Sequence, residues 1–241
     1  MNHDPYNAEM AAAMTADHKL REQALSVFIE SYKYRYSYNF TWLGRPIIQY
    51  PEDIIALQEI IWRVRPRLII ETGVAHGGSS LFFATLLELL GGDGMVAAIE
   101  LDLRSHNRAA IQDHPMSKRV TIFDGSSTDP VIARKIHDFA RKRDPVMVVL
   151  DSDHTHAHVL RELMLYSDLV KTGSYIVVLD TIIEFMPPTA FPDRPWGKGN
   201  NPFTAVSEFL VSDRRFAVDS ELESTLLLSS APGGYLRCRE N

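Results

Sequence analysis

The sequence predicts an α/β fold in which a doubly wound, mostly parallel sheet of seven strands follows an N-terminal helical extension. Five short, continuous, β-branched apolar runs recur between residues 67 and 181, as expected for strands buried on both faces. Four segments with helical apolar spacing separate them, which indicates right-handed crossovers. The 241 residues, 45% of them hydrophobic, are enough for one large domain with a sizeable core.

The N-terminal part differs from this alternating pattern. Residues 11–36 have helical spacing and overlap an aromatic stretch, YKYRYSYNFTWLG. That stretch is either a surface for a partner or substrate, or the contact that packs the extension onto the main domain. Residues 51–66 then begin with proline and an acidic pair, which favours a helix start. We predict a helical and aromatic extension over residues 1–50 and the main domain over residues 51–241.

Strands and helices alternate in the main domain. The predicted strands are RLIIETG, MVAAIELD, VTIFDGSS, VMVVLDSD and SYIVVLDT, and the helices between them are SLFFATLLELL, SHNRAAIQDH, VIARKIHDFARK and HVLRELMLYSDLV. Residues 182–202 are rich in proline and glycine, which predicts a long functional loop. A helix near residues 205–210 and two further strands, FAVDSEL and TLLLSSAPGGYLRC, complete the sheet, with the two strands as an edge hairpin.

Composition limits the function classes. The formal net charge of −6 provides no basic surface for nucleic acid or an anionic membrane. The single cysteine, Cys238, has no internal disulfide partner and is interpreted as a packed or exposed bystander rather than a nucleophile. The N-terminus has no signal-peptide pattern, and no apolar run reaches the roughly 18 residues of a membrane span. We expect a cytoplasmic protein with no membrane or nucleic-acid partner.

The ends of the five predicted strands carry ionisable residues. Ligands of open α/β sheets bind outside the carboxyl ends of the strands, so these ends form the candidate site. Acidic strand ends suit hydroxyls, amines and cations better than phosphates. Every strand end has a carboxylate; they read Glu71-Thr72-Gly73, Glu100-Leu101-Asp102, Asp124-Gly125-Ser126, Asp151-Ser152-Asp153-His154 and Asp180-Thr181.

The first strand end continues into a turn, ETGVAHGGSS, whose small residues Gly73, Ala75 and Gly78 let a ligand approach the backbone. The turn lacks the lysine of a phosphate-binding P-loop. A nicotinamide-binding turn remains open because Glu100 follows Gly73 by about 27 residues, near the expected ribose-binding acid. The acidic Glu71 would face a pyrophosphate badly. S-adenosylmethionine, with its sulfonium, amino group and ribose, is the preferred cofactor, and a tight turn without a ligand is the alternative.

Several motifs together suggest a family. They are ETGVAHGGSS, IELD, LDSDH, GSYIVVLDT and, most specific, the WLGRPIIQYP part of YNFTWLGRPIIQYPEDI. With them the chain resembles the cephalosporin hydroxylase and rhamnosyl O-methyltransferase family from about Tyr38 to the terminal PGGYLR. The resemblance implies a class I, Rossmann-like methyltransferase fold and methyl transfer from S-adenosylmethionine to a hydroxyl of a sugar or other natural product. It also implies a bound Mg²⁺ ion in many members and a homo-oligomer.

The resemblance also implies roles for the strand ends. Contacts to the amino acid part of the cofactor are expected from the first turn, ribose contacts from Glu100, and adenine neighbours from the third strand end. The predicted cofactor-binding residues are Glu71, Gly73, Ala75, Ser79, Glu100, Asp124, Gly125, Ser126 and Asp151.

The fourth strand end matches the D-x-x-H spacing of metal-dependent sugar O-methyltransferases. There the resemblance implies that Asp151 binds magnesium and His154 is the general base. A hard cation orients the acceptor hydroxyl and lowers its pKa, and the imidazole then removes the proton. Asp151 and His154 are therefore the predicted catalytic residues.

The fifth strand end departs from the family pattern, because Leu179-Asp180 stands where two adjacent acidic or amide oxygens are expected. The predicted metal ligands are Asp151, Asp180 and Asp153. Glu184 or water is an alternative for the missing ligand, and a weak or lost metal is a further possibility. In that last case His154 alone still serves as the base.

Other readings of the same residues remain open. One is a metal-dependent hydrolase or hydroxylase built on the aspartates and histidines, and another is a non-catalytic homologue that binds S-adenosylmethionine. We interpret His156 and His158 as a solvated helix start, because histidines at alternate positions of a helix do not converge on one ion. His76 is either a substrate contact or turn filler.

The loop over residues 182–202 is expected to close over the acceptor through Phe191, Trp196 and Lys198, although a loop that only packs on its own sheet is the alternative.

Overall fold

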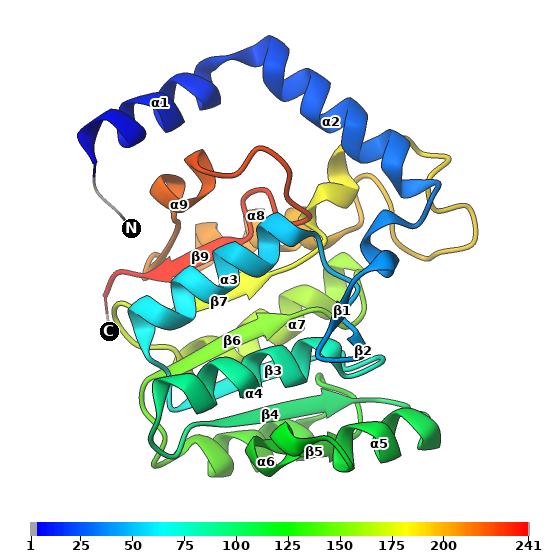
Figure 1. The fold of residues 1–241 in the computed structure, drawn as a ribbon, viewed down its shortest axis with the longest axis vertical. Helices are drawn as coiled ribbons and strands as arrows, with labels where there is room; N and C mark the ends of the chain where they lie inside the picture. The colour runs from blue at the N-terminus through cyan, green and yellow to red at the C-terminus, as the bar shows by residue number, and fades with distance from the viewer. Residues whose placement is uncertain (1–3, 241) are drawn as a thin grey trace.

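The computed structural model describes residues 4–240 and contains a seven-stranded sheet in the order β5-β4-β3-β6-β7-β9-β8 (Figure 1). Strands β3 to β7 run parallel, and β9 is antiparallel to both of its neighbours. The predicted doubly wound, mostly parallel sheet is confirmed. The strands are β3 (Leu68–Thr72), β4 (Met95–Glu100), β5 (Val120–Asp124), β6 (Val146–Leu150), β7 (Tyr175–Val178), β8 (Phe216–Val218) and β9 (Tyr235–Cys238).

Helices cover both faces of the sheet. One hydrophobic core lies under α3 (Pro51–Val64), α4 (Gly78–Leu90) and α5 (Ser105–Gln112). The other lies under α6 (Pro130–Ala140), α7 (His156–Tyr166) and α8 (Pro202–Ser212). Alternate residues of one strand enter opposite cores, which is why the central strands read as continuous apolar runs rather than alternating ones.

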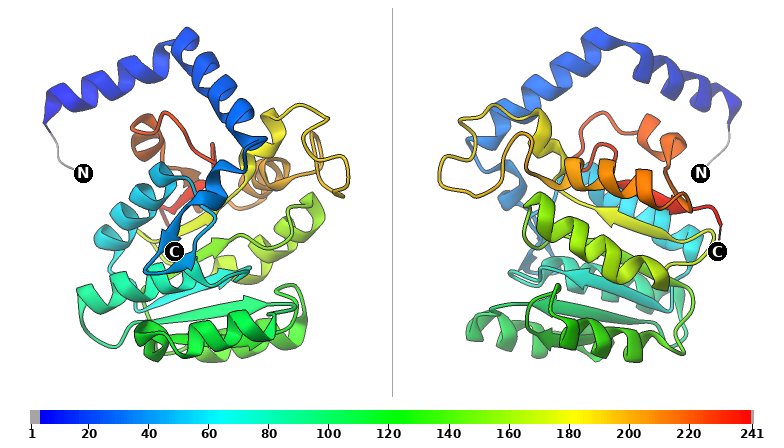
Figure 2. Two further views of the ribbon diagram at one scale, coloured as in Figure 1. Left: turned by 45° about the vertical axis from the view of Figure 1, so that its right-hand side comes forward. Right: turned by 180° about the vertical axis from the view of Figure 1, so that it is seen from behind.

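Residues 4–50 form two helices, a short 3-10 turn and a small hairpin. These are α1 (Pro5–Ala16), α2 (His18–Tyr32), η1 (Tyr36–Asn39), β1 (Thr41–Trp42) and β2 (Arg45–Pro46). The single helix predicted over residues 11–36 is divided at Asp17, whose carboxylate accepts a hydrogen bond from the Leu20 backbone N–H and so starts α2. Figure 2 shows α1 and α2 as an arm outside the sheet, with the end of α2 beside the loop that precedes α8.

None of the helices within residues 4–240 is long and apolar enough to cross a membrane.

The C-terminal strands are shorter than predicted, although their antiparallel pairing is confirmed. Strand β8 ends at Val218 because the Asp219 carboxylate accepts the Leu222 backbone N–H and starts the short helix α9 (Ser220–Ser224). Strand β9 occupies only Tyr235–Cys238 of the long segment predicted as a strand. Cys238 is buried there, as expected of a packed bystander.

Three further 3-10 turns complete the described chain: η2 (Pro115–Arg119), η3 (Ser167–Leu169) and η4 (Thr181–Phe185). The last of these begins the loop predicted over residues 182–202, and the rest of that loop is irregular as far as α8.

Candidate active site

A cavity of about 680 Å³ opens at the carboxyl ends of the parallel strands. This is the edge at which open α/β sheets bind ligands. The cavity wall is built from segments that are far apart in sequence: 46–50, 73–79, 99–101, 125–127, 151–154, 180–186 and 191–196.

Gly73 fixes the turn after β3. Its φ of +85° is left-handed, and a Cβ at this position would lie 2.1 Å from the Asp151 backbone oxygen, so only glycine fits. Beyond it, Glu100 Oε2 accepts the backbone N–H groups of Val74 at 2.8 Å and Ala75 at 3.0 Å. Glu100 therefore fastens the turn of β3 to the end of β4. Gly73, Ala75 and Glu100 all line the cavity.

Glu71 lies behind the turn and is not part of the cavity wall. Its side chain is 1% exposed and accepts a hydrogen bond from the Ser80 hydroxyl. Burial raises the pKa of Glu71 to about 7, and the charge of Glu100 adds to the rise, while hydrogen bonds from Ser79 and Ser80 oppose it. Of these residues, Ser79 lines the cavity and Glu71 supports it from below.

The third strand end divides in the same way. Gly125 and Ser126 line the cavity. Asp124 is exposed, does not line the cavity and forms an ion pair with Arg108 of α5.

Asp151, His154 and Asp180 converge in the cavity wall. Each offers one ligand atom, and these atoms all lie within 4.8 Å of one another. His154 Nε2 is 3.2 Å from Asp180 Oδ2, and Asp180 adopts a left-handed φ of +57° that turns the chain out of β7. Burial raises the pKa of Asp151 well above its usual range, and the nearby charges of Asp180 and Glu71 raise it further.

This cluster suits a divalent cation. Two carboxylates supply the hard oxygen ligands that Mg²⁺ or Mn²⁺ prefers, and the imidazole lies beside them, within reach of a group that they would orient. A cation would also offset the crowding of negative charge around Asp151. The cluster has one histidine and two carboxylates, whereas the facial triad of non-haem iron oxygenases has two histidines and one carboxylate.

The other predicted or alternative ligands have different partners. Asp153 Oδ1 accepts the Thr155 backbone N–H at 2.8 Å, just before α7, so its carboxylate is not part of the cluster. Glu184 Oε2 accepts the Gly199 backbone N–H at 2.8 Å and the Asn201 side-chain amide at 2.6 Å, which holds the loop before α8.

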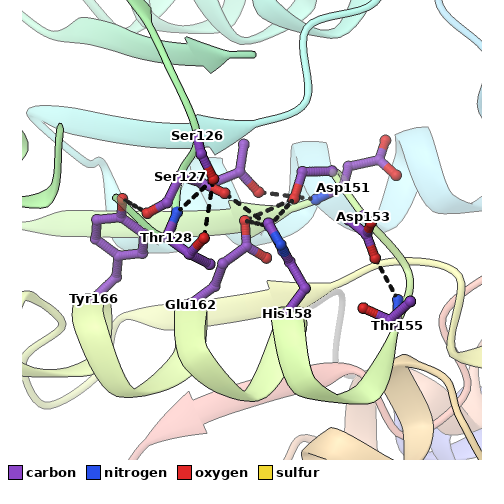
Figure 3. A network of polar contacts seen from close by, with 11 residues as sticks. Ser126, Ser127, Thr128, Asp151, Asp153, Thr155, His158, Glu162 and Tyr166 are labelled. Carbon is purple, nitrogen blue, oxygen red and sulfur yellow. Dashed lines mark hydrogen bonds and ion pairs between the residues drawn. The ribbon is translucent and has the colours of Figure 1, made fainter. Parts of the chain in front are cut away.

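A polar network lies beside the cluster, between α7 and the loops after β5 and β6 (Figure 3). His158 Nε2 lies 3.0 Å from Ser127 Oγ and 3.1 Å from Ser152 Oγ, and the Ser152 hydroxyl donates to Glu162 Oε1 at 2.7 Å. The Tyr166 hydroxyl donates to the Ser127 carbonyl at 2.5 Å. This network ties the loop after β5 to the loop after β6.

The predicted helix start is confirmed, because α7 begins at His156, but the expectation that the side chains of His156 and His158 are simply solvated is wrong. His158 lines the cavity and belongs to the polar network. His156 Nδ1 lies 2.8 Å from Thr204 Oγ1, and its Nε2 lies 3.1 Å from Glu208 Oε2, because α7 packs against α8.

Aromatic side chains, among them Trp196, Phe191 and Tyr32, line part of the cavity. The Trp196 ring packs edge-on against the His154 ring, with centroids 4.9 Å apart. Phe191 contacts Tyr32 of α2 edge-on at 5.2 Å, and both line the cavity. The predicted loop residues Phe191 and Trp196 thus reach the cavity, and Lys198 does not. His76 also lines the cavity, within the turn after β3.

Gln49 was not predicted as a site residue. It is buried, and its side-chain amide donates to Asp151 Oδ2 at 3.0 Å. Its only signal in the sequence is its place in WLGRPIIQYP, the segment most specific to the family resemblance.

The sheet order and a cavity at its carboxyl edge are those of the class I methyltransferase fold, and solved structures support this assignment. CmcI in its apo form aligns with a TM-score of 0.58 at 22% identity, over 84% of this chain and 77% of CmcI. CmcI with Mg and SAM aligns with a TM-score of 0.57 at 22% identity, over 83% and 77%. An O-methyltransferase from Bacillus cereus in complex with SAH aligns with a TM-score of 0.53 at 16% identity, over 87% and 88%.

Sequence comparison identifies the family. The family model described as Rhamnosyl O-methyltransferase/CmcI matches residues 34–239. The rhamnosyl O-methyltransferase of Mycobacterium tuberculosis is 31% identical over 201 residues, which cover 81% of this chain and 77% of that protein. The Mycobacterium leprae enzyme is 31% identical over 183 residues, covering 75% and 73%. The chain belongs to the rhamnosyl O-methyltransferase/CmcI family, and the predicted enzyme class, an O-methyltransferase, is confirmed.

Proposed function

We propose that the protein transfers the methyl group of S-adenosylmethionine to a hydroxyl of a small-molecule acceptor, with a divalent cation held by Asp151 and Asp180 and with His154 as the general base. One observation carries the proposal. The three clustered side chains and the glycine turn after β3 face the same cavity, so a cofactor on the turn and an acceptor at the cluster would be neighbours.

The cofactor half of the cavity extends from the β3 turn to the loop after β5. Gly73, Ala75 and Ser79 offer backbone and hydroxyl groups to the amino acid part of the cofactor. Glu100 lies at the next strand end, where its carboxylate suits the ribose hydroxyls. Gly125 and Ser126 would border the adenine. Glu71 and Asp124 do not line the cavity and would support the cofactor site indirectly, through their contacts with Ser80 and Arg108. The solved complexes of CmcI with SAM and of the Bacillus cereus enzyme with SAH support this choice of cofactor.

The acceptor half contains the proton-transfer group. A bound cation would orient the acceptor hydroxyl and lower its pKa. His154 would then take the hydroxyl proton as the acceptor oxygen forms its bond to the methyl carbon and the bond from that carbon to sulfur breaks. Trp196 packs against the imidazole and so limits its movement and its access to water.

The aromatic residues that line the cavity support an acceptor with a ring, such as a sugar or a flat natural product, because aromatic faces pack well against both. We also infer a homo-oligomer, as the family resemblance implies, which light scattering of the purified protein would test.

Calorimetric titration with S-adenosylmethionine, in Mg²⁺ and again in a chelator, tests the cofactor. One saturable site is the expected result, and the absence of S-adenosylmethionine binding in both buffers would refute the proposal.

Two variants separate the proposed roles at the cluster. Asp151→Asn should lose Mn²⁺ binding measured by calorimetry, because it removes a charged ligand. His154→Gln should keep Mn²⁺ binding and lose turnover by about 10²-fold or more, as expected for a general base. If His154→Gln loses Mn²⁺ binding as well, His154 is a ligand and not the base. His106→Gln, at an exposed position on α5, is the matched control.

A further inference from the structure

Residues 45–50 run along the cavity at the carboxyl edge of the sheet and contact the turn after β3, here called the cofactor turn. A Cβ on Gly78 would lie 2.1 Å from the Pro46 backbone oxygen, so the missing side chain makes room for this segment. The Arg45 guanidinium donates to the His76 carbonyl through Nε at 3.1 Å and Nη2 at 2.7 Å, and to Asn107 Oδ1 at 2.9 Å. This end of the segment is therefore fixed to the turn after β3 and to α5.

The other end is fixed to α2. The Tyr50 ring stacks on Phe28 with centroids 4.3 Å apart and an interplanar angle of 15°, and both side chains are buried. Gln49 lies between Ile48 and Tyr50, and the Gln49 side chain is buried, with 5% of its surface exposed.

Ile48 has a left-handed backbone, with φ of +55°. A β-branched residue rarely adopts this conformation, because its Cβ crowds the following carbonyl. Such strain persists where the surrounding structure over-determines it, and it clusters at functional sites. Here the strained residue lines the cavity and directly precedes Gln49, whose side chain reaches Asp151.

Gln49 donates its amide N–H to one carboxylate oxygen of Asp151, at 3.0 Å. Burial and the charges of Asp180, Glu71 and Glu162 raise the pKa of Asp151, whereas the hydrogen bond from Gln49 lowers it. A neutral amide donor can hold this carboxylate in place without competing for a cation, and it leaves the second oxygen free to bind one. Hydrogen-bonded groups of this kind orient metal ligands, and losing one typically weakens metal affinity by 10- to 100-fold.

We infer that Gln49 is a positioning residue that orients Asp151 for the divalent cation, and that the strained backbone at Ile48 aims it. The inference rests on the proposed function, since it needs a cation at the Asp151 cluster. It makes the segment before α3 part of the active site.

The test uses Mn²⁺ as the probe, titrated by calorimetry into the full-length protein without cofactor or acceptor. Gln49→Met keeps the length of the side chain and removes the amide, so Mn²⁺ affinity should fall by about 10- to 100-fold. S-adenosylmethionine affinity measured in a chelator should not change. Saturating Mn²⁺ should restore turnover, which a merely structural defect would not allow. Gln58→Met, at a half-buried position on α3, is the matched control and should bind Mn²⁺ like the wild type.

A pair of variants tests the strain. Glycine accepts a left-handed backbone and alanine does not, so Ile48→Gly should have a higher Tm than Ile48→Ala. Because glycine also frees the backbone that aims Gln49, Ile48→Gly should bind Mn²⁺ more weakly than Ile48→Ala. A higher Tm for the alanine variant would overturn the role assigned to Ile48.

The outcomes separate this inference from the proposed function. If the wild type binds Mn²⁺ and Gln49→Met binds it equally well, the positioning role is refuted and the cation site stands. If the wild type binds no Mn²⁺, the cation site itself is refuted, and the role of Gln49 with it. If Gln49→Met loses both Mn²⁺ and S-adenosylmethionine binding, Gln49 supports the whole cavity and has no specific role toward Asp151.

Discussion

Replacing Glu71 with glutamine should make the protein more stable above neutral pH. Glu71 is fully buried beneath the cofactor turn, and burial raises its pKa from 4.5 to about 7. The folded protein therefore holds a proton on Glu71 between these two pH values, where the unfolded chain has released it. The contribution of this group is most favourable below pH 4.5, and it is lost as the pH rises toward 7.

The magnitude follows from the shift. One unit of pKa corresponds to about 1.4 kcal/mol, so the rise from 4.5 to about 7 amounts to about 3 kcal/mol of stability lost at alkaline pH. Glutamine has the same shape and no charge, and the hydroxyls of Ser79 and Ser80 can donate hydrogen bonds to its carbonyl or accept them from its amide. Glu71→Gln should match the wild type near pH 4.5 and exceed it by about 3 kcal/mol at pH 8.

Urea unfolding at a series of pH values measures this difference, and thermal unfolding should show Glu71→Gln higher by roughly 6 to 12 °C at pH 8. Glu9→Gln, at an exposed position on α1, controls for the loss of one negative charge. Parallel stability curves for Glu71→Gln and the wild type would refute the reasoning, since they would mean that Glu71 ionises alike in the folded and unfolded chains.

Three further changes test other parts of the structure. Gly78→Ala should cost about 1–3 kcal/mol in urea unfolding, because its Cβ would meet the Pro46 carbonyl; an unchanged midpoint would contradict the close approach. Asp53→Ala should cost about 3 kcal/mol or more, because the buried carboxylate accepts three hydrogen bonds at 2.6 to 2.8 Å, and a loss below 1 kcal/mol would count against that role. Burial alone would lower the pKa of His158, but the hydrogen bond and charge of Glu162 outweigh it and raise the pKa. The stabilisation from charged His158 is present below pH 6.5 and is lost above the raised pKa. His158→Gln should therefore lower the free energy of unfolding more at pH 6 than at pH 9, measured by urea unfolding. An equal loss at both pH values would argue against a charged imidazole.

The fold was predictable because the strongest sequence signals coincide with the deepest burial. Residues of β3 and β6 are buried on both faces, and their continuous apolar runs predicted central parallel strands. The ends of strands were less predictable. At residues 219–222 a capping aspartate outweighs the apolar pattern and starts a helix where a strand was expected.

The site was predictable where parallel register brings strand ends together. Thr72 lies opposite Leu150, and Glu100 lies opposite Asp124, so side chains just beyond these pairs meet at one edge. Spacing along the chain did not predict Gln49, which reaches Asp151 from 102 positions away. Spacing also did not predict that the Asp153 carboxylate accepts the Thr155 backbone N–H, a local hydrogen bond that competes with cation binding.

The packing of the hydrophobic core explains why Leu179 stands where a ligand was expected. Tyr175, Val177 and Leu179 point into the same hydrophobic core, and the Leu179 N–H continues the ladder by donating to the Leu150 carbonyl at 3.0 Å. The left-handed turn at Asp180 then brings the next side chain into the cavity. Position 179 thus serves packing, and the proposed cation would have two carboxylates to hold it, Asp151 and Asp180. With so few charged ligands, cation affinity would depend strongly on how well each is held, and so the amide of Gln49 on Asp151 should matter more here than in a site with a third acid.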